Sequence, residues 1–141
     1  LKEPAMIKPI MKSEFFLRLP SEDAGPDDAA TGQDLLDTLL EHEHECVGLA
    51  ANMIGVRKRI ICVKDGNRAL LMYNPQILEQ VNAYQTSEGC LSLIGERPCT
   101  RYRRIKVEYL DENFVHRIKN FSGYTAEIIQ HEIDHCCGIV I

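Results

Sequence analysis

The chain has 141 residues, a net charge of −5, 45% hydrophobic residues and 26% charged residues, which is ordinary for one globular domain spanning residues 1–141. The negative charge argues against a nucleic-acid partner, since phosphate binding needs clustered Lys and Arg. No stretch approaches the length of a membrane span and no secretory signal is visible, so we expect a cytoplasmic protein without membrane contacts.

The first half of the chain predicts one loop, one helix and a pair of strands. Residues 20–32 are rich in Pro, Gly and Ser, which is typical of a loop. Thr31 then caps a helix over residues 33–46, whose leucines recur at the 3.6-residue spacing of an amphipathic helix. Residues 59–64 and 69–73 are rich in β-branched and apolar side chains, and an Asp-Gly-Asn turn signal separates them.

The second half predicts three more strands, over residues 77–84, 104–110 and 114–119. Asn74-Pro75 should separate the first of these from the preceding strand, and an Asp-Glu-Asn turn joins the last two into a hairpin. The basic run over residues 101–106 is typical of the solvated edge of a strand. Ser122 caps a final helix over residues 123–137, and Gly138 stands where a C-terminal cap belongs. These elements predict an α+β fold.

The six cysteines need a separate account, because an even number is compatible with disulfide bonds. They are Cys46, Cys62, Cys90, Cys99, Cys136 and Cys137. The chain has enough apolar residues for a core and no visible export signal. We therefore expect free thiols in a reducing compartment.

The final helix carries an HExxH motif, because residues 131–135 read His-Glu-Ile-Asp-His. Residues four apart lie one above the other on a helix, so His131 and His135 can converge on one metal ion. Glu132 is offset by about 100° around the axis, which places it beside the ion, where it can take a proton from a bound water. The face that carries the histidines also carries apolar side chains, which favours a pocket wall over a solvated helix.

Two histidines do not complete a catalytic metal site, which usually has three protein ligands and one position for water. Metzincin proteases have a third His six residues after the second, and that position is Ile141 here. If the chain ends there, the third ligand comes from upstream. Cys90 is the best candidate, since Gly89 lets the backbone bend next to it and a thiolate donates strong negative charge. The full set of candidates comprises His42, His44, Glu88, Cys90, Cys99 and His116.

Three motifs stand in a fixed order along the chain. Residues 48–53 read Gly-Leu-Ala-Ala-Asn-Met, residues 88–92 read Glu-Gly-Cys-Leu-Ser, and residues 130–135 read Gln-His-Glu-Ile-Asp-His. In these motifs the sequence resembles the peptide deformylase family, and the similarity extends from about Val47 to the end. The resemblance implies an α+β fold in which antiparallel β-sheets surround a central helix that carries HExxH.

The resemblance also implies an activity. Family members are metal-dependent amide hydrolases of protein biosynthesis that remove the N-formyl group from the N-terminal Met of nascent polypeptides, which places this chain near the ribosome exit. It implies one divalent ion, Fe²⁺ in the cell and Zn²⁺, Ni²⁺ or Co²⁺ in purified protein. Carried over by position, Cys90, His131 and His135 bind the metal, Glu132 transfers the proton, and the Leu91 backbone N–H points at the formyl oxygen.

Substrate contacts follow from the same resemblance. The backbones of Gly48 and Gly89 would pair with the substrate peptide in extended form, as in strand addition. Arg97 would help to hold the peptide. We expect Val47 and Ile128 to wall a shallow apolar pocket for the Met side chain.

One position departs from the family pattern. Where Met53 stands, the family has Gln, whose amide donates a hydrogen bond to the oxyanion, and methionine has no donor. Losing one such donor typically costs roughly 10²–10³ in rate, so we expect reduced activity. The alternative is a deformylase-like paralogue that binds metal with weak or no activity. A purely structural ion with Cys136 or Cys137 as fourth ligand is disfavoured, since both follow His135 on the wrong side of the helix.

Overall fold

The computed structural model describes residues 7–140, so Leu1 and Ile141 lie outside the described part. Its helices are α1 (Glu14–Leu17), α2 (Ala29–Glu41) and α3 (Gly123–Cys136), with 3₁₀ turns η1 (Pro26–Asp28) and η2 (Ala51–Ile54). Its strands are β1 (Gly48–Ala50), β2 (Ile60–Asp65), β3 (Arg68–Gly89), β4 (Glu96–Leu110) and β5 (His116–Ser122). The strands form one antiparallel sheet in the order β1-β2-β3-β4-β5.

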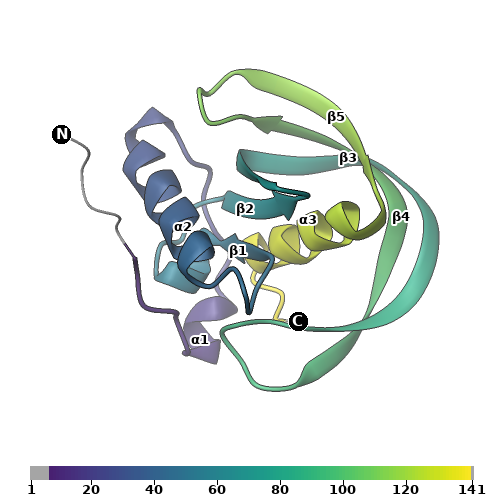
Figure 1. Cartoon of the computed structure of the whole chain (residues 1–141), viewed down its shortest axis with the longest axis horizontal. Coiled ribbons are helices and arrows are strands. Elements are labelled where there is room, and N and C mark those ends of the chain that lie inside the picture. Colours follow the sequence, from purple (N-terminus) through teal and green to yellow (C-terminus); the bar gives the residue numbers. More distant parts are fainter. Residues whose placement is uncertain (1–6, 141) are drawn as a thin grey trace.

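The sheet curves around α3, the helix that carries HExxH (Figure 1). The long strands β3 and β4 pass around this helix, while α2 lies on the other side of the short strands β1 and β2. Ala126 and Ile129 on α3 are fully buried, as are Ile61 and Val63 on β2. Burial of these side chains is the main favourable term holding the helix inside the sheet. The expected α+β fold with a central HExxH helix is confirmed.

The strand β3 runs for 22 residues, although Asn74-Pro75 was expected to end it. Asn74 adopts a positive φ of 54°, and the ladder to β4 shifts register between Tyr73 and Gln76. The Asn74 side chain exchanges two hydrogen bonds with the Ala24 backbone, at 2.7 and 2.9 Å. A β-bulge therefore accommodates the proline, and the two strands expected on either side are one.

The helix α2 begins and ends earlier than its leucine pattern predicts. It starts at Ala29 instead of residue 33, so the end of the expected loop over residues 20–32 is helical and Thr31 lies inside the helix. The start is set by the preceding turn, in which the Gly25 N–H donates to the Asp28 carboxylate at 2.9 Å. The helix ends at Glu41, since the chain turns at that point to enter β1.

The C-terminal elements agree closely with the sequence. The expected helix over residues 123–137 is α3, with Ser122 at its N-cap position and Gly138 at a φ of +78° beyond its end. The Ser122 side chain makes no capping hydrogen bond. The hairpin strands differ from their expected bounds: β4 begins at Glu96 instead of residue 104, and β5 ends at Ser122 instead of residue 119. The short elements α1 and β1 were not predicted. Between residues 7 and 140, none of the helices has the length and apolar character needed to cross a membrane.

Candidate metal centre

The helix α3 brings the two histidines of the motif together. The Nε2 atoms of His131 and His135 lie 3.0 Å apart, as expected for residues one helical turn apart on one face. The donor atoms of His131, Glu132 and His135 all lie within 4.8 Å of one another, and all three side chains are buried. The sequence prediction that these residues converge is therefore met by the geometry.

Glu88, at the end of β3, fixes the orientation of the His131 ring. Its Oε1 atom lies 2.7 Å from His131 Nδ1. A carboxylate at Nδ1 holds the proton on that nitrogen, which leaves the Nε2 lone pair directed at the site. Glu88, one of the candidate third ligands, therefore orients the His131 ring in this structure.

Arg101 supports this contact from β4. Its guanidinium donates to both Glu88 carboxylate oxygens, with the shortest bond at 2.8 Å, and its Nη1 atom lies 2.7 Å from Asp134 Oδ2. The Arg101 side chain is only 5% exposed, so the expectation that the basic run over residues 101–106 is solvated is wrong at this residue. Burial alone would raise the Glu88 pKa, but the hydrogen bonds from His131 and Arg101 outweigh it and lower that pKa.

Burial shifts the pKa values of Glu132 and His135 in opposite directions. Burial raises the pKa of Glu132 to about 7, although the nearby His131 charge partly opposes this. Burial, together with the charge of His131, lowers the pKa of His135 to about 3. Burial would also lower the pKa of His131, but the Glu88 hydrogen bond and the Glu132 charge outweigh it and raise that pKa. Glu132 is thus suited to exchange protons near neutral pH.

The residues fit a divalent cation. Two facing imidazole nitrogens form half of a tetrahedral coordination set, and nitrogen ligands suit Zn²⁺, Fe²⁺, Co²⁺ and Ni²⁺. The Oε1 atom of Glu132 is buried and has no hydrogen-bond partner within the described chain. A buried polar atom rarely stays unpaired, so this carboxylate requires a partner from outside the protein.

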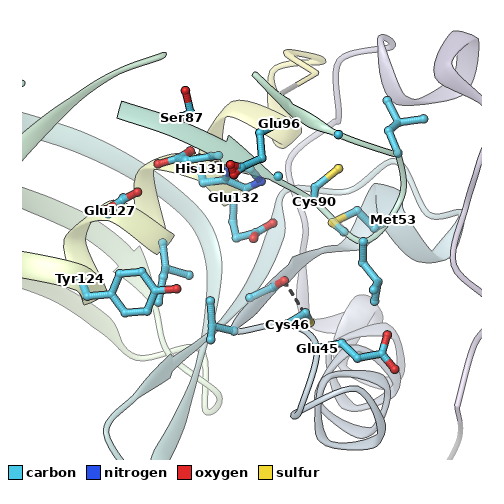
Figure 2. A pocket seen from close by; sticks show the side chains of 18 of the residues that line it. Glu45, Cys46, Met53, Ser87, Cys90, Glu96, Tyr124, Glu127, His131 and Glu132 are labelled. Carbon is cyan, nitrogen blue, oxygen red and sulfur yellow. Dashed lines mark hydrogen bonds and ion pairs between the residues drawn. The ribbon is translucent and has the colours of Figure 1, made fainter. Parts of the chain in front are cut away.

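Cys90 lies in the same pocket but outside the close group. The pocket has a volume of about 640 Å³, and its lining includes Cys90, His131 and Glu132. The Cys90 sulfur is not among the donor atoms that lie within 4.8 Å of one another. Figure 2 shows it beside Met53, directed away from the His131 ring. The structure therefore brings together the His-Glu-His group and leaves the predicted third ligand at its margin.

The other candidate ligands are engaged elsewhere or lie outside the group. His42 lies 3.8 Å from Glu45, and His116 Nε2 lies 2.9 Å from Glu108. His44 is exposed and Cys99 is half-buried, and neither lines the close group of donor atoms. All six cysteines are free thiols, as expected.

The predicted substrate contacts line the pocket with one exception. Val47, Gly48, Gly89, Leu91 and Ile128 all contribute to its wall. Gly48 allows β1 to approach α3 closely, since a Cβ there would lie 2.7 Å from Ile128 Cγ2 and 2.9 Å from a Glu132 oxygen. The exception is Arg97, which pairs with Glu88 in the ladder and does not line the pocket.

Met53 also lines the pocket, from η2. It is almost fully buried, and its thioether sulfur accepts the Ala50 N–H at 3.5 Å. The neighbouring Asn52 amide donates to the His135 carbonyl at 2.9 Å and is therefore not free to replace a missing donor. The side chain at position 53 offers the pocket no hydrogen-bond donor.

Known proteins share this fold and site. The family model for polypeptide deformylase matches residues 8–141. A peptide deformylase from Clostridium beijerinckii is 52% identical over 96% of this chain and 100% of its own length. The Met-Ala-Ser-bound crystal structure of a peptide deformylase from Acinetobacter baumannii is 29% identical, with a TM-score of 0.85 over 95% of this chain and 96% of its own. For the crystal structure of the enzyme from Thermus thermophilus, the identity is 33% and the TM-score 0.84, over 95% of this chain and 83% of its own.

The fold and the helix-borne His-Glu-His group define a metallohydrolase. The chain belongs to the polypeptide deformylase family, whose members are metal-dependent and remove a formyl group.

Proposed function

We propose that the protein removes the N-formyl group from the N-terminal Met of new polypeptides, in the cytoplasm and near the ribosome exit, with residues 1–141 as one catalytic domain. The observation that carries the proposal is the buried His131-Glu132-His135 group in a deformylase-family fold. His131 and Glu132 line a pocket, and Glu88 locks the His131 ring. Family membership supports the reaction class, and the pocket supports a peptide-sized substrate.

The metal ligands are His131, His135 and Cys90, with Fe²⁺ in the cell and Zn²⁺, Ni²⁺ or Co²⁺ in purified protein. Support for Cys90 comes from its place in the same pocket lining as His131, in the irregular segment that follows β3. A divalent cation bound by these residues would supply Lewis-acid chemistry, lowering the pKa of a bound water and polarising the formyl carbonyl.

The chain's own groups move the proton and hold the substrate oxygen. Glu132, with its pKa raised to about 7, accepts the proton of the attacking water and returns it to the departing amine nitrogen. The Leu91 backbone N–H donates to the formyl oxygen, where negative charge develops. Glu88 keeps the His131 proton on Nδ1 throughout.

The substrate peptide adds to free strand edges. Gly48 lies on β1, the outermost strand of the sheet, and Gly89 ends β3 beside the pocket. An extended peptide between them would pair with both backbones. Val47 and Ile128 would contact the Met side chain. The peptide contact of Arg97 stays a prediction, because this side chain does not line the pocket.

Anaerobic purification, metal analysis and formate release from formyl-Met-Ala test the proposal. We expect one metal per chain and formate release from the wild type. Cys90→Ser should lower metal content and activity together, while Cys137→Ser, which changes an exposed thiol, should alter neither. Unchanged metal content in Cys90→Ser would remove Cys90 from the ligand set.

A second candidate function rests on Met53. Because this side chain gives the pocket no donor, a metal-binding paralogue with little turnover is the alternative. One metal per chain without formate release from any formyl-Met peptide would favour the paralogue over the enzyme.

A further inference from the structure

The two histidines of the metal centre are supported unequally. Glu88 lies 2.7 Å from His131 Nδ1, whereas the Nδ1 atom of His135 is buried and has no hydrogen-bond partner among residues 7–140. The His135 ring is fully buried, and its Nε2 atom lies 3.0 Å from His131 Nε2. A neutral histidine that offers Nε2 to a cation carries its proton on Nδ1, and metal-binding histidines almost always donate that proton to an acceptor. The His135 ring therefore requires an acceptor that direct contacts within the described chain do not give it.

Asn52, in η2, contacts the same histidine from outside the helix. It is fully buried, and its Nδ2 atom donates to the His135 carbonyl oxygen at 2.9 Å. The helix α3 ends at Cys136, so this carbonyl is among the last four of the helix, which have no partner in the regular helical pattern. The Gly138 N–H also reaches the oxygen, at 3.0 Å. The Asn52 amide thus fixes the end of α3 that carries His135 to a segment 83 residues earlier.

The other polar atom of the Asn52 side chain is also buried and unpaired. Asn52 Oδ1 has no hydrogen-bond partner in the described part of the chain. This atom is an acceptor and His135 Nδ1–H is a donor, so the two unpaired atoms are complementary and belong to residues already joined by a hydrogen bond. Leaving both unpaired would cost free energy twice. A single buried water that accepts from Nδ1–H and donates to Oδ1 would satisfy both atoms.

A second unpaired oxygen, on Ser21, belongs to a residue that binds the end of α3. Ser21 Oγ has no hydrogen-bond partner among the described residues, and the Ser21 backbone N–H donates to the Cys136 carbonyl at 2.8 Å. This contact runs through the backbone and reaches the residue after His135, whereas the Asn52 side chain itself binds His135. Asn52 is also completely buried, while Ser21 is half-buried. These contacts favour Asn52 as the partner of His135.

We propose that Asn52 is the positioning residue of His135. Its amide nitrogen holds the backbone of this proposed ligand, and its Oδ1 atom receives the Nδ1 proton, through one water, when Nε2 binds a divalent cation. Asn52 is thus the neutral counterpart of Glu88. His135 should be the weaker electron donor of the two histidines, because a carboxylate acceptor raises the basicity of an imidazole more than an amide does. The inference rests on the proposed role of His135 as a metal ligand.

Zinc affinity tests the assignment. Competition with a chelator should show roughly 10–100-fold weaker Zn²⁺ binding in Asn52→Leu, which keeps the approximate size of the side chain and removes both polar atoms. Asn52→Asp keeps an oxygen acceptor and loses the donor to the His135 carbonyl, so it should recover part of the lost affinity.

Two control variants separate positioning from stability. Thr38→Val replaces a fully buried polar side chain on α2 that makes two hydrogen bonds, and Ser21→Ala removes the competing oxygen. Both should bind Zn²⁺ like the wild type. Asn52→Leu and Thr38→Val should each lower the urea midpoint of the metal-free protein, so a loss of zinc affinity confined to Asn52→Leu cannot be a consequence of lower stability.

The ring protons give a second readout that does not depend on activity. In ¹H–¹⁵N spectra of the zinc-loaded wild type, His131 and His135 should both carry the proton on Nδ1, with the downfield shift of a hydrogen-bonded proton. Asn52→Leu should move the His135 Nδ1–H resonance upfield and leave the His131 resonance in place, because Glu88 still accepts that proton.

These measurements can overturn the inference without touching the deformylase function. Unchanged zinc affinity in Asn52→Leu, an equal loss in Thr38→Val, or a loss in Ser21→Ala alone would do so. If Asn52→Leu does not fold, the wild type decides, since a zinc-loaded His135 with no downfield-shifted Nδ1–H has no such partner. A wild type that binds no Zn²⁺ would overturn the proposed metal centre itself, whereas absent formate release would leave this inference standing.

Discussion

The pocket has two walls that are held together very differently. The helix wall consists of α3 and the strand ends beside it, where Glu88, Arg101 and Asp134 are joined by charged hydrogen bonds of 2.7–3.1 Å. The loop wall, over residues 90–95, has no regular structure, and Ile94 within it is fully exposed. Among residues 7–140, one side-chain hydrogen bond supports it, from the Lys12 ammonium to the Leu91 carbonyl at 2.7 Å.

This difference separates two kinds of function. Metal binding and proton transfer need fixed geometry and shifted pKa values, and these depend on the helix wall. The proposed oxyanion contact of Leu91 lies on the loop wall, which has less side-chain support. Changes in the helix wall should therefore remove activity, whereas changes in the loop wall should adjust it.

The largest effect is expected from Glu132→Gln, which removes the proton acceptor from the helix wall. Formate release should fall by roughly 10²–10⁴, the usual contribution of general acid–base catalysis. Metal content should stay at the wild-type level, since the proposed ligands are untouched. Formate release and metal analysis on the same preparation check both parts. Retention of more than a tenth of the activity would mean that another group takes the proton.

Arg101→Met breaks the ion network behind His131. It leaves the Glu88 charge buried without its main partner, so the free energy of unfolding should fall by about 3–5 kcal/mol. Metal affinity should fall by roughly 10–100-fold, because Glu88 no longer holds the ring firmly. Urea unfolding and metal titration measure these effects. Arg103→Met is the matched control, since that guanidinium only lies over the Tyr84 ring and should contribute about 1 kcal/mol or less.

Met53→Gln should place a hydrogen-bond donor at a position where Met53 has none. Turnover on formyl-Met peptides should rise by up to about 10²-fold, the lower end of the value of one oxyanion donor. The KM should change little, because the bond strengthens as charge develops. Met53→Leu has similar size without a donor and should show no gain. If the Gln variant were no faster than the Leu variant, position 53 would not limit the rate.

The smallest effect is expected from Lys12→Met in the loop wall. The lost hydrogen bond to the Leu91 carbonyl is worth about 1 kcal/mol, so kcat should drop a few-fold as the Leu91 N–H becomes less well placed. Lys12→Arg keeps a donor and should restore the rate. Thermal stability should fall only slightly, because Lys12 is exposed and the lost bond contributes at most about 1 kcal/mol. A rise in KM at constant kcat would instead assign Lys12 to substrate binding.

The helix wall was largely predictable from sequence because its signals are local. The 3.6-residue period, the Ser122 and Gly138 boundaries and the spacing of His131 and His135 lie within one segment. The same reasoning failed for Arg101. Its place in a basic run suggested solvent, and only the pairing of β3 with β4 brings it against Glu88, 13 residues away.

Other errors also arose from long-range contacts. Asn74-Pro75 has the local signature of a strand end, but the Asn74 side chain binds the Ala24 backbone 50 residues earlier and stabilises a bulge. The position of the Cys90 thiol could not be predicted either, because Cys90 begins an irregular segment that has no local sequence pattern to fix its conformation.

The bulge in β3 also determines which side chains reach the metal centre. From the Glu79–Lys106 pair to the Gly89–Glu96 pair, β3 and β4 keep one register. The irregular stretch between Tyr73 and Glu79 therefore sets which residues of β3 and β4 lie opposite each other beyond it. A one-residue deletion between Asn74 and Ile77 would turn alternate side chains to the opposite face and carry Glu88 out of reach of His131. Length variation in this family should accordingly be tolerated at the hairpin tips and excluded from this short stretch.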